Sequence, residues 1–155
     1  MYGYVFSGCT SLTSIVIPES LTVISNAFNG CSSLTNVTMH NRVTEIQAMA
    51  FKGCSSLTSI TIPNSVTYIG CEAFANCDNL TSIYCKATTP PAMYYYYTFY
   101  PAFYQYPLPR NSNMKIYVPR NSYNDYMQYS DFANQETSPQ NWYIYESYIE
   151  PYDFE

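Results

Sequence analysis

Six cysteines are the most reactive side chains of this 155-residue chain, and four of them recur at a fixed spacing. Thiols in pairs could form disulfides, and thiols grouped with histidine could bind zinc. The recurring cysteines follow each other at steps of 22, 23 and 23 residues: Cys9, Cys31, Cys54 and Cys77. Zinc sites use ligand pairs two to four residues apart, whereas Cys71 and Cys77 are six apart. The spacing therefore does not favour a metal site.

A fixed repeat position has a structural consequence for these thiols. Residues at one repeat position form a column with neighbours about 4.8 Å apart, and their parallel Cβ directions give poor disulfide geometry. Because free cysteine behaves as a small hydrophobe, we predict buried thiols, with one disulfide or a metal as the alternatives. Cys85 replaces an apolar strand residue and fits this interpretation, whereas Cys71 has no repeat counterpart.

Other residues with catalytic potential are few. The single histidine, His40, occupies the position of Pro18 and Pro63 in sister repeats, and we interpret it as a solvent-facing residue at a strand end. No Ser/His/Asp or Cys/His set can be built around it, and each glycine stands alone at a turn. Paired carboxylates are possible only in the tail, where we expect a solvated face: Glu146, Glu150, Asp153 and Glu155. The sequence therefore predicts no enzymatic activity and no cofactor.

The recurring cysteine belongs to a longer phrase of about 23 residues. It reads Ala-Phe-x-Gly-Cys-Ser-Ser-Leu-Thr-Ser-Ile-Thr-Ile-Pro-x-Ser-Val-Thr-x-Ile. Its aromatic and leucine positions are Phe6, Phe28, Phe51 and Phe74, and Leu12, Leu34, Leu57 and Leu80. Self-similarity at a period in the twenties is typical of a solenoid, in which each unit buries its apolar face against its neighbours.

One repeat shows how a rung would be built. Residues 57–63 follow the pattern L-x-x-I-x-I with alternation of apolar and polar side chains at its end, which indicates a short strand with one buried face, and Pro63 ends it. Residues 66–69 supply a second pair of inward side chains on the opposite wall, and Phe74 places one aromatic ring per rung in the interior. Successive rungs would align these strands in parallel, about 4.8 Å apart.

The phrase in residues 27–34, 50–57 and 60–70 resembles the BspA-like leucine-rich repeat of bacterial surface proteins. The likeness is close over residues 4–86, and residues 83–91, 116–119 and 141–154 are similar to the family's terminal rungs and closing segment. The resemblance implies a leucine-rich repeat solenoid of about five rungs, mostly strand and irregular structure. It also implies extracellular or cell-surface display, adhesion to host proteins or other cells, and no catalysis.

We expect three segments within one structural domain: solenoid rungs over 1–86, a Tyr/Pro-rich insertion and last rung over 87–121, and a C-terminal cap over 122–155. In the cap, Ser122 with Asp125 forms a capping-box-like start that predicts a short α-helix over 122–133. Residues 142–154 predict a final extended segment that docks back, and Trp142 is interpreted as core packing of the cap.

Composition excludes two classes of partner. The formal net charge is −5, and residues 87–155 hold three basic and seven acidic side chains. The sequence contains no basic stripe of the kind that binds nucleic acid, and no run of 18 apolar residues that could insert into a membrane.

The chain begins, at residues 1–6, in the middle of a rung and shows no signal peptide there. We expect a fragment, or a gene whose upstream rungs and export signal lie elsewhere; an authentic start is the alternative.

Tyrosine is concentrated in the C-terminal half: 16 of 19 lie at or after Tyr84. Ile83 to Ile116 is 33 residues, ten more than the repeat predicts, so a Tyr/Pro-rich loop is inserted between two rungs. Tyrosine buries area at low entropic cost and keeps a polar group, which suits recognition surfaces. The loop could be a lid over the last rung or part of a binding surface, and both interpretations stay open.

The outward strand positions predict where a partner would bind. One column reads Val16, Thr38, Thr61, Tyr84, Tyr117, and its companion reads Ser14, Asn36, Ser59, Ser82, Lys115. The concave wall therefore changes from small hydroxyls to aromatic rings toward the C-terminus, and solenoids bind partners on such walls. The candidate binding residues are Ser59, Thr61, Ser82, Tyr84, Lys115, Tyr117, Tyr95 and Tyr97.

Three functions fit these residues. The first is a protein-interaction or adhesion module for an extracellular protein ligand. The second is a glycan-binding module, which would expose two or more tyrosine rings in one plane near Tyr84 and Tyr117. The third is a structural spacer. The sequence leaves the ligand and the oligomeric state open.

Overall fold

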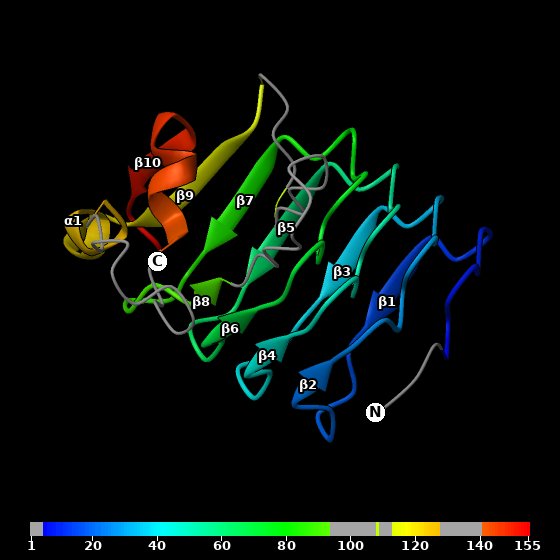
Figure 1. Ribbon diagram of the computed structural model, residues 1–155. Coiled ribbons are helices and arrows are strands. Elements are labelled where there is room, and N and C mark those ends of the chain that lie inside the picture. Colours follow the sequence, from blue (N-terminus) through cyan, green and yellow to red (C-terminus); the bar gives the residue numbers. More distant parts are fainter. Residues whose placement is uncertain (1–4, 94–107, 109–112, 128–140) are drawn as a thin grey trace, which may run out of the picture.

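Repeated short strands build one wall of the molecule. The computed structural model describes residues 5–93, 108, 113–127 and 141–155. The strands of this first wall are β1 (Ser14–Val16), β3 (Asn36–Thr38), β5 (Ser59–Ile62), β7 (Ser82–Cys85), β9 (Lys115–Pro119) and β10 (Ile149–Tyr152). They lie side by side along the molecule (Figure 1), with β1 paired to β3 and β5, β7, β9 and β10 paired in that order. Every pair is parallel, as the stacking of successive repeats predicts.

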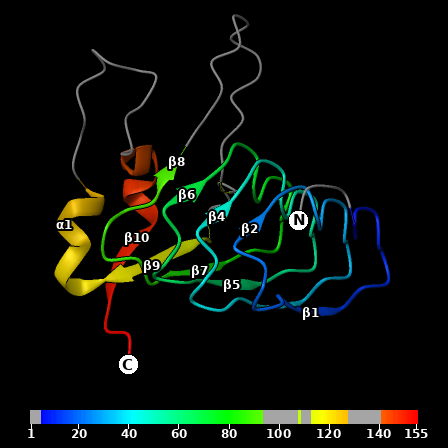
Figure 2. The same cartoon turned by 90° about the horizontal axis from the view of Figure 1, so that it is seen from below.

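The opposite wall consists of two-residue strands. These are β2 (Val23–Ile24), β4 (Glu45–Ile46), β6 (Tyr68–Ile69) and β8 (Ala92–Met93), paired in that order and all parallel. Figure 2 shows the two rows of strands as separate walls of one solenoid. The predicted inward pair of the second wall, Val66 and Ile69, is buried.

Between the walls the repeated aromatic residues form a column. The rings of Phe6, Phe28, Phe51 and Phe74 are stacked, with centroids 5.6, 5.3 and 5.3 Å apart and interplanar angles of 3°, 8° and 11°. Leu34, Leu57 and Leu80 are fully buried beside them. The repeat phrase thus places identical side chains on top of one another, and each rung completes the core of the next.

Side-chain donors join neighbouring rungs in addition to the backbone. Thr44 Oγ1 donates to the carbonyl oxygen of Thr22 (3.2 Å), and Thr67 Oγ1 donates to that of Thr44 (3.3 Å). The cysteine column makes an equivalent ladder, in which each thiol donates to a phenylalanine carbonyl of the preceding rung: Cys31 to Phe6, Cys54 to Phe28 and Cys77 to Phe51, at 3.0, 3.3 and 3.1 Å.

The prediction of buried thiols is confirmed for four cysteines and wrong for two. All six are free, and Cys31, Cys54, Cys77 and Cys85 are buried. Burial raises the pKa of Cys77 to about 12 and that of Cys85 to about 11. Cys9 is exposed because no described rung lies beyond it, and Cys71, without a repeat counterpart, is partly exposed.

The C-terminal cap begins with a 3₁₀ turn, η1 (Arg120–Ser122), and the helix α1 (Tyr123–Tyr126). Ser122 precedes α1 but makes no side-chain capping hydrogen bond, so the predicted capping box is wrong. Ser122 is buried instead. Residues 128–133 of the expected helix lie outside the described residues.

The rest of the cap differs in part from the expected extended segment. A 3₁₀ helix, η3 (Asn141–Tyr148), precedes β10, so only residues 149–152 are a strand. Trp142 is buried, as predicted, and its Nε1 donates to the carbonyl oxygen of Pro91 (2.7 Å). Buried Tyr145 accepts from the amide of Leu108 (3.1 Å) and donates to its carbonyl oxygen (3.0 Å). The cap therefore holds backbone of the inserted segment at Pro91 and Leu108.

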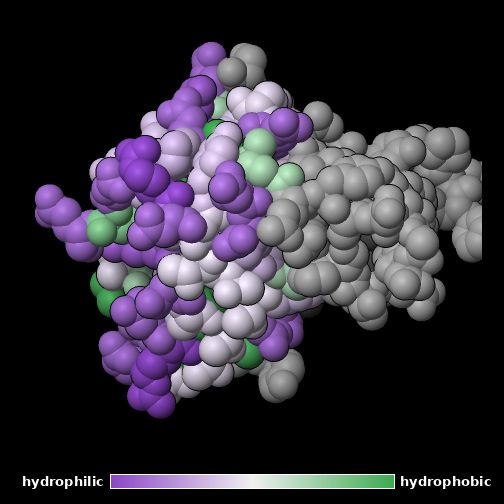
Figure 3. Space-filling view, turned by 90° about the vertical axis from the view of Figure 1, so that its left-hand side faces the viewer, coloured by the Kyte–Doolittle hydropathy of each residue, from purple (hydrophilic) through white to green (hydrophobic). Residues whose placement is uncertain are grey.

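Seen from the cap end, the described surface is mainly hydrophilic to neutral, with small hydrophobic spots (Figure 3). The large apolar side chains of the cap point inward: Tyr126, Trp142 and Tyr145 are each 1% exposed or less. The cap thus covers the apolar end of the stack, which a solenoid needs for solubility.

The structure tests two expectations about polar residues. His40 is not solvent-facing: its side chain is 13% exposed, Nε2 donates to the carbonyl oxygen of Pro18 (2.8 Å), and Nδ1 accepts from the amide of Arg42 (3.1 Å). The acidic tail faces solvent as expected, since Glu146, Asp153 and Glu155 are exposed, and Glu150 and Asp153 also form ion pairs there.

Candidate binding surface

The outward side chains of the first wall form a surface that we call the strand face. Register places Ser59, Ser82 and Lys115 in one row, and Thr61, Tyr84 and Tyr117 in the next. The same two rows begin in β1 and β3 with Ser14 and Asn36, and with Val16 and Thr38. The predicted columns of outward residues are thus present in the structure.

The strand face has two parts of different chemistry. Over β1, β3 and β5 its outward side chains are small and exposed, including Val16 at 70%. Over β7 and β9, Tyr84 and Tyr117 replace them and are half-buried. A bulky aromatic ridge therefore stands at one end of a floor of small side chains.

Three tyrosines make up this ridge. The rings of Tyr84 and Tyr117 are nearly parallel, with centroids 4.8 Å apart at 14°. Tyr152 of β10 packs edge-on against both, at 5.7 Å from Tyr84 and 5.4 Å from Tyr117. Parallel rings this close cannot lie in one plane without atomic overlap, so Tyr117 covers one face of Tyr84. The arrangement is an offset stack with one edge-on partner, which is favourable for aromatic rings.

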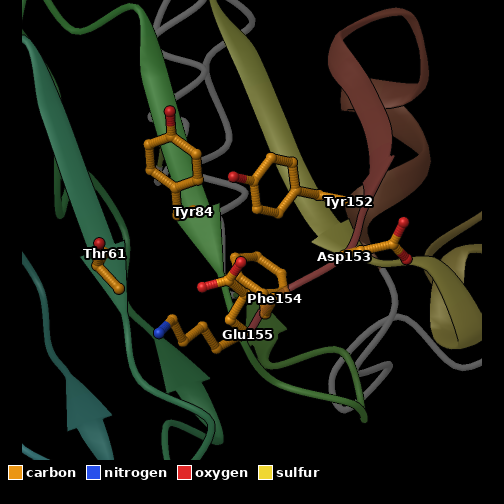
Figure 4. A pocket seen from close by; sticks show the side chains of 7 residues that line it. Thr61, Tyr84, Tyr152, Asp153, Phe154 and Glu155 are labelled. Atoms are coloured by element: carbon orange, nitrogen blue, oxygen red, sulfur yellow. The ribbon is translucent and has the colours of Figure 1, made fainter.

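An open hollow of about 490 Å³ lies on the strand face beside this ridge (Figure 4). Its lining combines three rings with hydroxyl and charged groups: Thr61, Tyr84, Lys86, Tyr152, Asp153, Phe154 and Glu155. Thr61 and Tyr84 come from neighbouring strands, and residues 152–155 come from the end of β10 and beyond. In the strand order β9-β7-β5, Tyr117 and Thr61 flank Tyr84 on opposite sides, and Thr61 lines the hollow whereas Tyr117 does not, so the hollow lies on the side of Tyr84 away from Tyr117.

Ion pairs fix the polar groups around the ridge. Arg120 binds the Asp153 carboxylate through Nε at 2.9 and 3.1 Å and through a terminal nitrogen at 3.0 Å. This contact lowers the pKa of Asp153 and raises that of Arg120. Lys115 Nζ lies 2.5 Å from Glu150 Oε1, which raises the pKa of Lys115. The Lys115–Glu150 pair joins β9 to β10. The Arg120–Asp153 pair joins the turn after β9 to the residue that follows β10.

Lys86 has a different contact. Its Nζ lies 5.7 Å from the centroid of the Phe154 ring, within the range of a cation–π interaction. Among the described residues it forms no ion pair. The hollow therefore holds one ammonium that is available to a ligand.

The predicted candidate residues divide into three groups. Thr61 and Tyr84 line the hollow, and Ser59, Ser82 and Tyr117 lie next to them on the strand face. Lys115 lies on the same face but is paired to Glu150. Tyr95 and Tyr97 lie outside the described residues.

Sequence reasoning missed Lys86, Tyr152 and Phe154. Lys86 is two residues after Tyr84, which places it on the same side of the strand. Tyr152 could have been found from Ile149. Side chains alternate between the two faces of a strand, so if Ile149 is buried, Tyr152, three residues later, lies on the outer face. Neither signal revealed that the two segments meet, since this depends on β10 pairing with β9.

A second hollow, of about 440 Å³, lies on the opposite wall and is lined by Glu45, Gln47, Ala48 and Tyr68. Gln47 Nε2 donates to Glu45 Oε2 (2.9 Å), so its two most polar groups are engaged with each other. Within the described ranges, no three His, Cys, Asp or Glu side chains are grouped so that they could hold a metal ion. In the same ranges, no helix is long and apolar enough to cross a membrane.

Comparisons with known proteins agree with this architecture. The family described as BspA type leucine rich repeat region matches residues 1–104 in six copies. A leucine rich cell surface protein from Faecalibacterium prausnitzii A2-165 has a similar solved structure, with a TM-score of 0.50 and 27% identity over 74% of this chain and 38% of that one.

A leucine-rich repeat protein from Bacteroides ovatus ATCC 8483 shows 22% identity over 75% of this chain and 42% of that one, with a TM-score of 0.39. No curated protein matches the chain. The chain spans about two fifths of the length of these two solved relatives. The stacked parallel strands and the matched repeats confirm the predicted solenoid: the chain belongs to the BspA-type leucine-rich repeat family.

Proposed function

We propose that this chain is a non-catalytic recognition module, displayed outside the cell or on its surface, that binds an extracellular protein through the strand face. The family and the similarity to a bacterial cell surface protein support a role in protein interaction. The observation that carries the proposal is the aromatic ridge of Tyr84, Tyr117 and Tyr152 beside a floor of small side chains.

The chemistry of the face suits a protein partner of neutral to basic charge. Tyrosine is enriched in recognition surfaces because it offers a large rigid ring and a hydroxyl group. Two carboxylates near the ridge, Glu150 and Asp153, are paired with Lys115 and Arg120, Glu155 lines the hollow beside it, and the whole chain carries a net charge of −5. An acidic partner would be repelled at long range.

The two alternatives are less well supported. A glycan chain stacked along a flat aromatic platform requires coplanar rings, whereas Tyr84 and Tyr117 overlap face to face. A structural spacer needs no difference between its rungs, whereas the strand face changes from hydroxyls to half-exposed rings at β7.

The test is direct binding of the purified chain to a panel of extracellular matrix and cell-surface proteins, compared with a Tyr84→Ala/Tyr117→Ala variant. We expect a partner whose affinity falls at least about tenfold in the variant, or about 1.4 kcal/mol. The matched control is Tyr68→Ala, a half-buried tyrosine on the opposite wall. A partner bound equally by all three proteins would place the site elsewhere, and no partner in the panel would favour the spacer.

A further inference from the structure

We propose that the hollow beside Tyr84 is a subsite for one neutral sugar residue carried by a glycoprotein partner. This inference rests on the proposed function and names the chemistry that the same site recognises. This subsite differs from a flat glycan platform. It needs one uncovered side of a tyrosine ring with polar groups around it, whereas the platform needs several coplanar aromatic rings.

The apolar half of the subsite is made by three rings. Tyr152 and Phe154 are tilted by 60° with centroids 4.9 Å apart, and Tyr152 meets Tyr84 at 69°. The rings therefore form a corner rather than a flat surface. The C–H face of a pyranose can pack against the side of Tyr84 that Tyr117 leaves free, with the corner behind it. Tyr152 is 42% exposed, so this apolar surface is available to a ligand.

The polar half offers both donors and acceptors. Lys86 supplies an ammonium and Thr61 a hydroxyl, while Glu155 supplies carboxylate oxygens. Sugar hydroxyls both donate and accept hydrogen bonds, so they can satisfy all of these groups together. Figure 4 shows Thr61 on one side of the hollow and Tyr152 and Phe154 on the other, with Tyr84 projecting from β7 at its edge.

The same mixture of charges argues against a charged ligand. An anionic group would gain from Lys86 but would face the carboxylate of Glu155. A cationic group would gain from Glu155 but would face the Lys86 ammonium, which already lies over the Phe154 ring. Asp153 adds little to either case because Arg120 holds its carboxylate. A neutral polyol meets no repulsion at this site.

The volume is consistent with a small ligand. Ligand pockets are usually about 300–1,000 Å³, and this hollow measures about 490 Å³. Because it is open to solvent, a bound sugar would keep part of its surface in water and could remain linked to a longer chain. We expect an affinity for a single sugar on the order of 1 mM, about −4 kcal/mol.

The test is an NMR titration of the isotope-labelled chain with three kinds of methyl glycoside. The neutral kind comprises the methyl glucoside, galactoside and mannoside, and the others are a methyl glucuronide (acidic) and a methyl glucosaminide (basic). We expect at least one neutral glycoside to shift the amide signals of Thr61, Tyr84, Lys86 and residues 152–155. The two charged glycosides should bind at least about threefold more weakly than the best neutral one.

Two variants with matched controls locate the site. Lys86→Gln should weaken neutral glycoside binding at least about threefold, whereas Arg42→Gln, another exposed cation far along the stack, should not. Tyr152→Ala should abolish the shifts, and Tyr68→Ala should not. Thermal melting of each variant establishes that it is folded; Lys86 is exposed, so its replacement leaves the core intact.

The outcomes separate this inference from the proposed function. No shift with any neutral glycoside, or tighter binding of a charged one, would overturn the sugar subsite even if a protein partner is found. Shifts confined to another part of the chain would overturn it as well. Neutral glycoside binding that Lys86→Gln and Tyr152→Ala weaken would support it, even if the first protein panel contains no partner.

Discussion

At the scale of single residues, serine, threonine and cysteine do more in this chain than cover its surface. Thr35 and Thr81 donate to carbonyl oxygens of the preceding rung, as do Thr44, Thr67 and the three buried cysteines of the column. Among the described residues, no buried side-chain nitrogen or oxygen lacks a partner. The repeated hydroxyl and thiol positions therefore act as bridges between rungs.

Stability at alkaline pH should report on the buried thiols. The pKa of Cys85 is raised from 9.0 to about 11, first by burial, so the folded state keeps its proton where the unfolded state loses it. Below pH 9 this contribution is fully present, and it is lost as pH rises through the folded pKa. We expect the free energy of unfolding to fall between pH 9 and 11 by about 1.4 kcal/mol per pH unit for this thiol.

Urea unfolding at several pH values measures this slope. Cys85→Ala should give a shallower decline than the original chain, whereas Val66→Ala, a buried change without a titrating group, should lower stability equally at every pH. The same slope in all three proteins would show that folding does not raise the pKa of Cys85.

Gly70 is required by a close approach of two rungs. A Cβ atom at this position would lie 2.4 Å from the amide nitrogen of Ala48 and 2.7 Å from the carbonyl carbon of Gln47. Because both are backbone atoms, neither can move aside easily. Gly70→Ala should lower the free energy of unfolding by about 1–3 kcal/mol, measured by urea titration. Ser59→Ala, at an exposed strand position, serves as the control, and equal stability of both variants would contradict the contact.

At the scale of elements, each rung depends on its neighbours for its core. Leu57 is fully buried in the middle of the stack. Leu57→Ala should cost about 2–5 kcal/mol, because a cavity forms between two rungs that are held apart by the Phe51 column. Thermal and urea unfolding measure the loss. An unchanged melting temperature would mean that the rungs collapse to fill the space.

The cap elements are tied to the inserted segment by hydrogen bonds from buried aromatic residues, one from Trp142 and two from Tyr145. Trp142→Phe keeps most of the ring but removes the Nε1 donor, which leaves the carbonyl oxygen of Pro91 unpaired. We expect a loss of about 1–3 kcal/mol in urea unfolding. Tyr148→Phe, a half-buried change in the same helix η3, should be close to neutral. Equal losses in the two variants would indicate a general effect of η3.

At the scale of the whole molecule, the two described ends of the stack differ. At the C-terminal end, β10, α1 and η3 cover the last rung, and Pro151 in β10 has no backbone N–H donor. At the other end, Phe6, Leu12 and Ile15 are only partly buried, although their repeat counterparts Phe28 and Leu34 are fully buried. Stability should therefore rise along the stack from β1 toward β7.

Native-state hydrogen exchange can measure this gradient at equivalent positions. The amides of Thr35 and Thr81 each donate to the carbonyl oxygen of the threonine one rung earlier, both at 2.9 Å. We expect the Thr35 amide to exchange faster, because the rungs around β1 open with a lower free energy than those around β7. Equal exchange rates would show that the stack opens as one cooperative unit.

The sequence alone predicted most of the fold. A phrase repeated four times predicts rungs of the same structure, and each rung buries its apolar face by stacking on the next. The parallel strands, the phenylalanine column and the inward leucines follow from this stacking. The residues without repeat counterparts were predicted less well. Ser122 lacks its expected capping bond, residues 141–148 form a 3₁₀ helix, and His40 is held by Pro18 rather than by solvent.

The candidate surface divides in the same way. Tyr84 and Tyr117 could be placed from the sequence, because both follow the repeat and the period of a strand is two. Tyr152, Phe154 and the role of Lys86 depended on tertiary structure. Local pattern cannot tell which strand β10 will join, since that choice is made by contacts between distant segments, including the pairing of Ile149 with Ile116 and the ion pair of Arg120 with Asp153. The repeat thus determined the wall and its tyrosines, and only the folded cap decided that a hollow forms beside them.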